Sequence, residues 1–131
     1  MAKDDGRVIS NFIMQSLRDN EITIYGDGSH SRSFQYVDDL VEGLIRMMRR
    51  DNFTGPVNIG NPEEVSMREL AEMIKKKTGS KSKIVYLPEI KDDPRQRCPD
   101  IALARSALGW KPTVSLRDGL DKTISYFRRI L

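Results

Sequence analysis

Residues 32–49 read RSFQYVDDLVEGLIRMMR, and the spacing of their apolar side chains changes partway along. From Ser33 to Val37 aromatic and polar residues alternate, which indicates an extended segment. From Asp38 onward apolar residues recur every three or four positions, which predicts an amphipathic helix. Its apolar face consists of Val37, Leu40, Val41, Leu44, Ile45 and Met48. An extended segment that leads directly into a helix indicates a fold containing both kinds of element.

The chain continues this mixed pattern on both sides of that stretch. Ser66 with Glu69 forms a capping box that predicts a helix from Met67, and Gly79 is a typical helix end. Apolar periodicity predicts further helices over 7–19, 101–108 and 115–131, and short strands over 22–25, 56–59 and 83–87. This order predicts an α/β (α+β) fold, with residues 1–131 forming a single domain.

Composition limits the possible functions. The chain has 131 residues, of which 38% are hydrophobic and 31% charged, so it can bury one modest core. One cysteine and one histidine exclude a disulfide framework and a zinc-type ligand set. No apolar run is long enough to cross a bilayer, so we expect no membrane segment. The net charge of +3 suits a small anionic ligand and is too weak to indicate nucleic acid.

The sequence lacks the usual catalytic and nucleotide-binding motifs. A single histidine argues against a Ser-His-Asp set, and neither G-x-x-x-x-G-K-[ST] nor G-x-G-x-x-G occurs. These 131 residues therefore have the character of a binding module.

Two clusters near the centre of the first half are candidates for contacting an anionic, partly aromatic ligand. The predicted strand at Thr23 ends at Tyr25, whose ring offers a stacking surface beside backbone polar groups. The alternative is an ordinary strand and turn. Arg32 lies two residues before an aromatic residue in an extended segment, and a guanidinium binds phosphate with paired hydrogen bonds. The alternative there is a surface arginine.

The third cluster is DDPRQRCPD, residues 92–100. Its two prolines favour extended backbone, so Arg95 and Arg97 stay out of a helix and point to one side of the chain. Two arginines held in this way suit a diphosphate. The alternative is a charged loop whose acids and bases neutralise each other, with Asp100 capping the helix that follows.

Together these clusters resemble the C-terminal part of the UDP-glucuronate decarboxylases, also called UDP-xylose synthases, of the extended short-chain dehydrogenase/reductase superfamily. The matching stretches within residues 4–131 are DDGRVISNFI, ITIYGDGSHSRSFQYVDDLVEGLIRMM, GPVNIGNPEE, DDPRQRCPDI and LGWKP. The R-x-F-x-Y-V-x-D pattern also occurs in sugar-nucleotide epimerases and dehydratases, whereas NIGNPEE followed by DDPRQR-x-PDI is specific to the decarboxylases. The chain departs from the family at His30-Ser31, where Gln-Thr is frequent, and at Cys98, where a basic residue is usual.

The resemblance implies a small C-terminal substrate-binding lobe that lacks its Rossmann domain. In the family that N-terminal domain holds NAD, and the smaller lobe closes over a UDP-sugar. The resemblance also implies a homodimer for the full-length protein. We expect a cytoplasmic chain, or the Golgi or ER lumen if the full-length parent has an upstream anchor.

The resemblance assigns roles to six residues. The Thr23 backbone and the Tyr25 ring correspond to uracil contacts, and Arg32 and Arg97 correspond to diphosphate ligands. The two remaining positions are Asp100, near the ribose hydroxyls, and Arg7, near the cofactor and sugar.

The family's reaction oxidises C4 of the sugar, releases the C6 carboxylate as carbon dioxide and returns the hydride. Its Tyr-x-x-x-Lys pair is not among these 131 residues. We therefore expect a truncated UDP-sugar-binding portion that is inactive alone. The alternatives are a lobe of a UDP-sugar 4-epimerase and a noncatalytic self-associating module.

Overall fold

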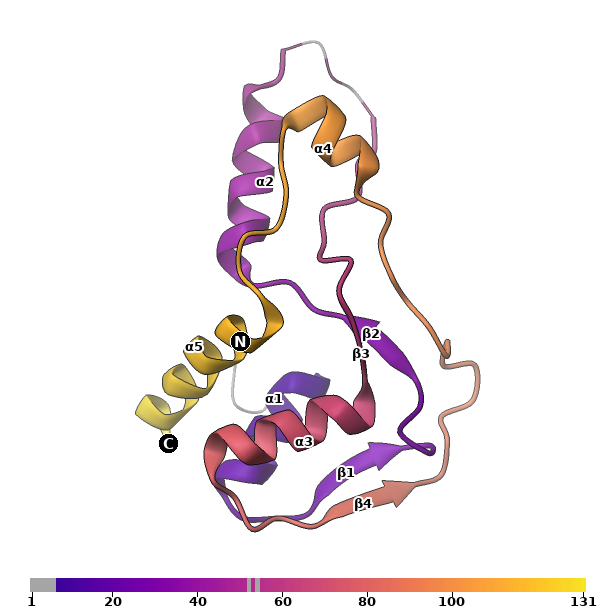
Figure 1. Ribbon diagram of the computed structural model, residues 1–131, viewed down its shortest axis with the longest axis vertical. Helices are drawn as coiled ribbons and strands as arrows, with labels where there is room; N and C mark the ends of the chain where they lie inside the picture. Colours follow the sequence, from indigo (N-terminus) through magenta and orange to yellow (C-terminus); the bar gives the residue numbers. More distant parts are fainter. Residues whose placement is uncertain (1–6, 52, 54) are drawn as a thin grey trace. The chain divides into compact units, whose positions relative to one another are not determined.

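The structure is a computed structural model that describes residues 7–51, 53 and 55–131. Its elements follow the chain in this order (Figure 1): α1 (Val8–Leu17), β1 (Ile22–Tyr25), β2 (Ser31–Ser33), α2 (Val37–Arg49), β3 (Glu64–Ser66), α3 (Met67–Thr78), β4 (Ile84–Leu87), α4 (Ala102–Leu108) and α5 (Leu116–Ile130). The mixture of helices and short strands confirms the predicted fold class.

The chain divides into two compact units. The first contains the residues up to Ser31, Val65–Gln96 and Leu120–Leu131, and the second contains Arg32–Glu64 and Arg97–Gly119. The boundary falls within β2 and β3, which pair in a two-stranded sheet. That residues 1–131 act as one UDP-sugar-binding lobe stays a prediction.

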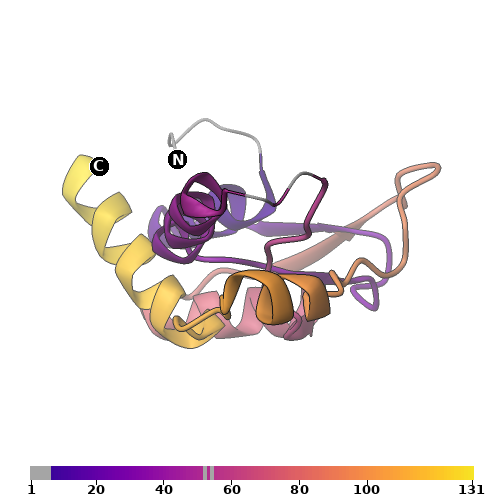
Figure 2. The same ribbon diagram turned by 90° about the horizontal axis from the view of Figure 1, so that it is seen from above.

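The first unit is built on the parallel pair of β1 and β4, in which Ile22 lies opposite Ile84 and Tyr25 opposite Leu87 (Figure 1; Figure 2). The side chains of Ile22 and Ile24 are buried, whereas Tyr25 is 49% exposed. Alternate strand residues point to opposite faces, so one face of β1 is free to form core. That core is completed by Phe12, Ile13, Leu70, Ile74, Leu120, Ile124 and Phe127 from the three helices of the unit.

Helix α3 begins and ends where the local sequence signals indicate. The Ser66 hydroxyl accepts a 3.1 Å hydrogen bond from the Glu69 N–H, which confirms Ser66 as the N-cap. The Glu69 carboxylate accepts from that hydroxyl at 3.0 Å, rather than from the Ser66 N–H of an ideal capping box. Gly79 ends the helix in the left-handed region at φ +67°.

The second unit has its own core around Trp110, which is 1% exposed and clusters with Ile101 and Ala104. Half-buried Val57, Ile59 and Leu108 pack against this cluster. The predicted strand over 56–59 is wrong, because these described residues pair with no strand. Apolar side chains in a short run pack against a core equally well without a ladder of backbone hydrogen bonds.

Helix α2 shows a second difference from expectation. Its buried residues are Asp39 and Gly43, while the apolar positions Val37 and Met48 are 57% and 80% exposed. A β-carbon at position 43 would lie 2.8 Å from Ile59, so only glycine fits this close approach.

The extended segment predicted over 33–37 also differs from the structure. The strand β2 lies earlier, at Ser31–Ser33, and Val37 already belongs to α2.

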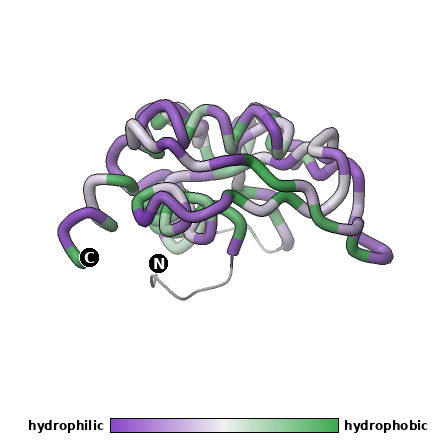
Figure 3. The backbone as a smooth tube through the Cα atoms, turned by 90° about the horizontal axis from the view of Figure 1, so that it is seen from below, coloured by the Kyte–Doolittle hydropathy of each residue, from purple (hydrophilic) through white to green (hydrophobic). Residues whose placement is uncertain are grey.

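Hydrophobic and hydrophilic positions alternate along the described backbone rather than gathering in long runs (Figure 3). Within the described residues, no helix combines the length and the apolar character needed to cross a membrane.

Candidate functional site

The carboxyl end of β1 presents Tyr25 at the surface. Thr23, two residues earlier, is half-buried and is held by Gln15 of α1. The Thr23 N–H donates to Gln15 Oε1 at 3.1 Å, and Gln15 Nε2 donates to the Thr23 hydroxyl at 2.9 Å. A uracil that used the Thr23 N–H would therefore have to displace the Gln15 side chain.

A tight turn leads from β1 to β2. Gly26 and Gly28 adopt φ values of +89° and +84°, which side chains with a β-carbon rarely adopt. A β-carbon at position 28 would also lie 3.1 Å from Arg68 and 3.2 Å from Tyr86. We call residues 26–31 the β1–β2 turn and residues 88–97 the arginine loop, because the latter carries Arg95 and Arg97.

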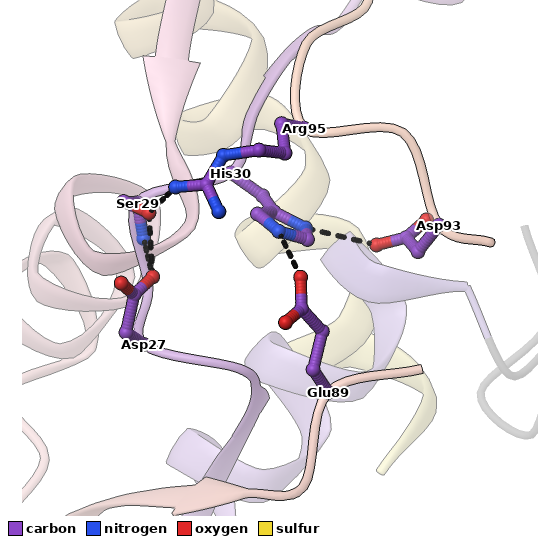
Figure 4. A network of polar contacts seen from close by, with 6 residues as sticks. All are labelled: Asp27, Ser29, His30, Glu89, Asp93 and Arg95. Carbon is purple, nitrogen blue, oxygen red and sulfur yellow. Dashed lines mark hydrogen bonds and ion pairs between the residues drawn. The ribbon is translucent and has the colours of Figure 1, made fainter. Parts of the chain in front are cut away.

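His30 connects the β1–β2 turn to the arginine loop (Figure 4). Its ring is 3% exposed, with Nδ1 hydrogen-bonded to Asp93 Oδ2 at 3.1 Å. Nε2 lies 2.7 Å from Glu89 Oε1, close enough for an ion pair but off the line of a well-aligned hydrogen bond. A nearly buried ring thus contacts two carboxylates of one loop.

A second connection joins the same two segments. Arg95 Nη2 donates a 2.8 Å hydrogen bond to the Ser29 hydroxyl, and that hydroxyl donates to Asp27 Oδ1 at 2.5 Å (Figure 4). The Ser29 hydroxyl and N–H, followed by the charge of Arg95, lower the pKa of Asp27 below its ordinary value. The ionised Asp27 carboxylate therefore supports the hydroxyl that Arg95 contacts.

The arginine loop runs beside β2. The Ser31 N–H donates to the Arg95 carbonyl at 2.8 Å, and Ser31 and Gln96 form a parallel bridge. Two residues after Ser31, the Ser33 hydroxyl donates to the Arg97 carbonyl at 3.5 Å. Arg32 and Arg97 each lie one residue beyond this bridge, on the two adjacent segments. The structure thus brings these two predicted phosphate ligands into neighbouring positions.

The NIGNPEE stretch supports both arginine-bearing segments within the second unit. Asn61, which is 7% exposed, donates from Nδ2 to the Phe34 carbonyl at 3.1 Å. A β-carbon at Gly60 would lie 2.8 Å from the Pro99 ring, so glycine allows the chain after Arg97 to approach. Asn61 and Gly60 of this motif therefore have structural roles: one forms a hydrogen bond, and the other leaves room for a neighbouring segment.

The predicted site residues are divided between the units. Arg7, Thr23 and Tyr25 belong to the first unit, and Arg7 is the exposed N-cap residue of α1. Arg32, Arg97 and Asp100 belong to the second. Asp100 Oδ1 accepts a 2.9 Å hydrogen bond from the N–H of Ala102, the first residue of α4, although the N-cap position of that helix is Ile101. The structure brings Arg32 and Arg97 together; the roles of all six residues stay predictions.

Sequence reasoning missed the residues that hold the site in place. Gln15 and Glu89 are not among the predicted site residues, His30 is named there only as a departure from the family, and Asp93 belongs only to the charged loop. The residues that meet at His30 are about sixty positions apart, and no local pattern pairs them. The one sequence signal for this site was His30 itself: it is the only histidine among the 131 residues and stands where the family often has glutamine.

Known proteins resemble this chain over nearly its whole length. The family model described as GDP-mannose 4,6 dehydratase matches residues 3–123. UDP-glucuronic acid decarboxylase 1 of Danio rerio is 53% identical over 100% of the chain, and the protein of that name in Arabidopsis thaliana is 51% identical over 100%. The chain spans 31% and 30% of the lengths of these two relatives.

Solved structures show the same fold. MoeE5 in complex with UDP-glucuronic acid and NAD matches with a TM-score of 0.92 at 33% identity, covering 100% of this chain and 44% of that one. UDP-glucuronic acid 4-epimerase from Bacillus cereus, in complex with UDP-glucuronic acid and NAD, matches with a TM-score of 0.90 at 32% identity, covering 96% and 41%. With the family model matching most of its residues, the chain belongs to the GDP-mannose 4,6 dehydratase family of extended short-chain dehydrogenases/reductases.

Proposed function

We propose that this chain is the UDP-sugar-binding portion of a UDP-glucuronate decarboxylase, whose whole protein converts UDP-glucuronate to UDP-xylose and carbon dioxide. The identity of about half to decarboxylases from a fish and a plant supports this choice over a 4-epimerase. The epimerase from Bacillus cereus is only 32% identical.

One observation carries the binding proposal: Arg32 and Arg97 occupy neighbouring positions on adjacent extended segments. Two guanidinium groups on neighbouring segments suit the two phosphates of a nucleoside diphosphate, because a guanidinium donates paired hydrogen bonds to a phosphate. Exposed Arg97 is open to a ligand from solvent. We assign these two arginines to the diphosphate.

The remaining site residues have supporting roles in this proposal. The half-exposed Tyr25 ring stacks on the uracil, while Thr23 contributes backbone polar groups. Asp100 uses the carboxylate oxygen that does not accept from Ala102 to bind a ribose hydroxyl. These contacts fix the orientation of the nucleotide, and none of them transfers a proton or a hydride.

The NAD of the proposed reaction takes up and returns a hydride, and the family's N-terminal Rossmann domain is its proposed site. The 131 residues contain no G-x-G-x-x-G loop, and Arg7 is the single residue assigned near the cofactor. No chemical step is therefore assigned to this chain. Homodimerisation of the whole protein and a cytoplasmic location, or a Golgi or ER lumen for a parent with an upstream anchor, belong to the same proposal.

Calorimetric titration with UDP tests the binding proposal. We expect weak binding, because a partial cleft leaves much of the ligand in water. Arg97→Ala should lower the affinity by about tenfold or more, the loss of one charge-assisted hydrogen-bond pair. Arg117→Ala, which removes an exposed arginine from α5, is the matched control and should leave the affinity unchanged. Absence of heat, or equal affinities for both variants, would overturn the proposal.

A second candidate function rests on α2. Val37, Leu40, Val41, Leu44 and Met48 are 38–80% exposed on this one helix. Exposed apolar patches of this kind are typical of protein–protein contacts. A noncatalytic self-associating module is therefore the alternative, and light scattering at increasing concentration separates it from a monomeric ligand-binding lobe.

A further inference from the structure

We propose that the C-terminal ends of α2 and α4 form a second anion site, which binds a single phosphate group, free or on a small organic molecule. The site is a hollow of about 230 Å³ that we call the α2–α4 hollow; it is lined by Arg46, Arg49, Arg50, Ala107 and Leu108. This inference does not rest on the proposed function, because the hollow contains none of the residues assigned to the UDP-sugar.

The three arginines converge at one end of α2. Arg49 and Arg50 follow Arg46 by three and four positions, the spacing at which side chains on a helix are neighbours. Helix α4 lies beside this end of α2, and both helices belong to the second unit (Figure 1). Ala107 and Leu108, at the end of α4, add an apolar wall. A hollow lined by charges of one sign and an apolar wall concentrates the positive potential of its arginines.

Arg46 is held in place by contacts that use only part of its guanidinium. Its Nε donates to Glu42 Oε1 at 2.9 Å, and its Nη1 donates to the carbonyls of Leu108, at 3.2 Å, and of Gly109. These bonds satisfy carbonyl groups at the end of α4, where the helix dipole is negative. Among the described residues no group accepts from Nη2, so two N–H donors of a fixed side chain stay available to a ligand.

The charges of Arg49 and Arg50 are not neutralised. Both side chains are exposed, and within the described ranges neither forms an ion pair or a side-chain hydrogen bond. Glu42 is already paired with Arg46, and the exposed Asp51 forms no ion pair in the same part of the chain. Positive charge at a helix end complements the helix dipole, but like charges three or four positions apart repel. A bound anion relieves that repulsion and pairs with both arginines.

The size of the hollow and its chemistry together specify the ligand. Pockets for drug-sized molecules usually enclose about 300–1,000 Å³. At about 230 Å³ the α2–α4 hollow is small for a nucleotide-sugar and suits one phosphate group with a short organic body. A guanidinium donates paired hydrogen bonds to a phosphate, and two unneutralised arginines match the charge of a phosphate dianion.

The hollow is separate from the site proposed for the diphosphate. Arg32 precedes α2, whereas the hollow lies at the other end of that helix. The 13 residues of α2 give it a length of about 20 Å. One phosphate group cannot contact both ends, so the two sites can be measured independently.

Residue-resolved NMR of the whole chain tests the inference. Inorganic phosphate and glycerol 3-phosphate are titrated separately at pH 7.5 and constant ionic strength, and the backbone amide signals of Ala107 and Leu108 are followed. We expect these signals to shift and to reach saturation with either probe. Tighter binding of glycerol 3-phosphate would identify a phosphorylated small molecule as the ligand, and tighter binding of inorganic phosphate would identify the free anion.

A double variant removes the two unneutralised charges. Arg49→Gln with Arg50→Gln retains polar side chains of good helix propensity, so circular dichroism should not change. Affinity for phosphate should fall about tenfold or more, the loss of charge-assisted hydrogen bonds. The matched control, Arg117→Gln with Arg129→Gln, removes the same charge from exposed positions of α5 and should leave the affinity unchanged.

The outcomes separate this inference from the proposed function. The amide signals of Ser33 and Cys98, next to Arg32 and Arg97 in the chain, report on the diphosphate site. If UDP does not shift them while phosphate saturates the hollow and the double variant alone weakens it, the proposed function fails and this inference stands. If Ala107 and Leu108 do not shift, shift without saturation, or respond equally in the double variant and the control, the hollow attracts an adventitious ion only and the inference is overturned.

Discussion

The carboxylate of Asp39 accepts hydrogen bonds from both the N–H and the hydroxyl of Thr113, at 3.1 and 2.9 Å, although the two residues are 74 positions apart. A further bond of 3.0 Å comes from the Val114 N–H to the other carboxylate oxygen. Asp39 is 4% exposed, and its own carbonyl accepts from Trp110 Nε1 at 2.9 Å. Helix α2 is thus attached to the segment after α4 by polar contacts rather than by its apolar face.

Asp39→Ala should therefore destabilise the second unit. It leaves two backbone N–H groups and a hydroxyl without their acceptor, and we expect the free energy of unfolding to fall by about 2–4 kcal/mol. Urea denaturation followed by Trp110 fluorescence measures the change. Asp38→Ala, at the exposed neighbouring position, should change stability by less than about 0.5 kcal/mol. Similar losses in both variants would show that the buried carboxylate contributes little.

Gly28→Ala should destabilise the first unit more than Gly79→Ala does. Both glycines have positive φ, at +84° and +67°, so each substitution costs about 1–2 kcal/mol for the left-handed backbone. Only at position 28 does the added carbon meet neighbours, at 3.1 and 3.2 Å, whereas nothing lies within 4 Å at position 79. Thermal unfolding by circular dichroism compares the two variants. Equal melting temperatures would contradict the crowding around the β1–β2 turn.

Local sequence signals predicted the elements that depend on local contacts. The start and end of α3 follow from Ser66 and Gly79, whose effects act within one helical turn. The strand predicted over 56–59 failed because pairing depends on a partner elsewhere in the chain. Apolar side chains such as Ile59 have the same sequence pattern whether they pair or simply pack against Trp110.

The same distinction applies to the site. Arginine chemistry and two prolines indicated Arg95 and Arg97 together, and only the family resemblance selected Arg97; the structure adds that its segment lies beside the one that carries Arg32. The groups that hold the arginine loop were out of reach, because His30 and Asp93 are 63 positions apart. The burial of Asp39 was equally hidden from the sequence. The groups that donate hydrogen bonds to its carboxylate belong to Thr113 and Val114, more than seventy positions along the chain. A buried polar group is defined by its partners, which sequence periodicity does not specify.

Protonation of Asp27 should make the stability of the first unit depend on pH. Its pKa is lowered by hydrogen bonds from the Ser29 hydroxyl and N–H and by the charge of Arg95. A carboxyl whose pKa is lowered in the folded state contributes stability that is complete above its ordinary value of 3.8 and is lost as pH falls through the lower folded value. We therefore expect the stability difference between the unmodified chain and Asp27→Asn to narrow as pH is lowered from 5 through that range.

Urea midpoints measured for both proteins at successive pH values provide the measurement. Asp51→Asn, an exposed acid of the second unit, serves as the matched control. A difference between the unmodified chain and Asp27→Asn that stays constant or widens on acidification would have the wrong sign for this linkage.

Self-association through α2 is the prediction that separates the two candidate functions. Val41 and Leu44 are 47% and 51% exposed near the middle of the helix, so a second copy of the chain would bury them first. For a self-associating module, sedimentation velocity should show an average molar mass that increases with protein concentration. The double variant Val41→Lys, Leu44→Lys adds two charges to the apolar face and should remain a monomer. Asp38→Lys adds charge to an exposed position of the same helix outside the apolar face and should leave association unchanged. Both substituted side chains are already half-exposed, so the circular dichroism spectrum of the double variant should match that of the unmodified chain. If the unmodified chain is a monomer at all concentrations, the self-associating module is excluded.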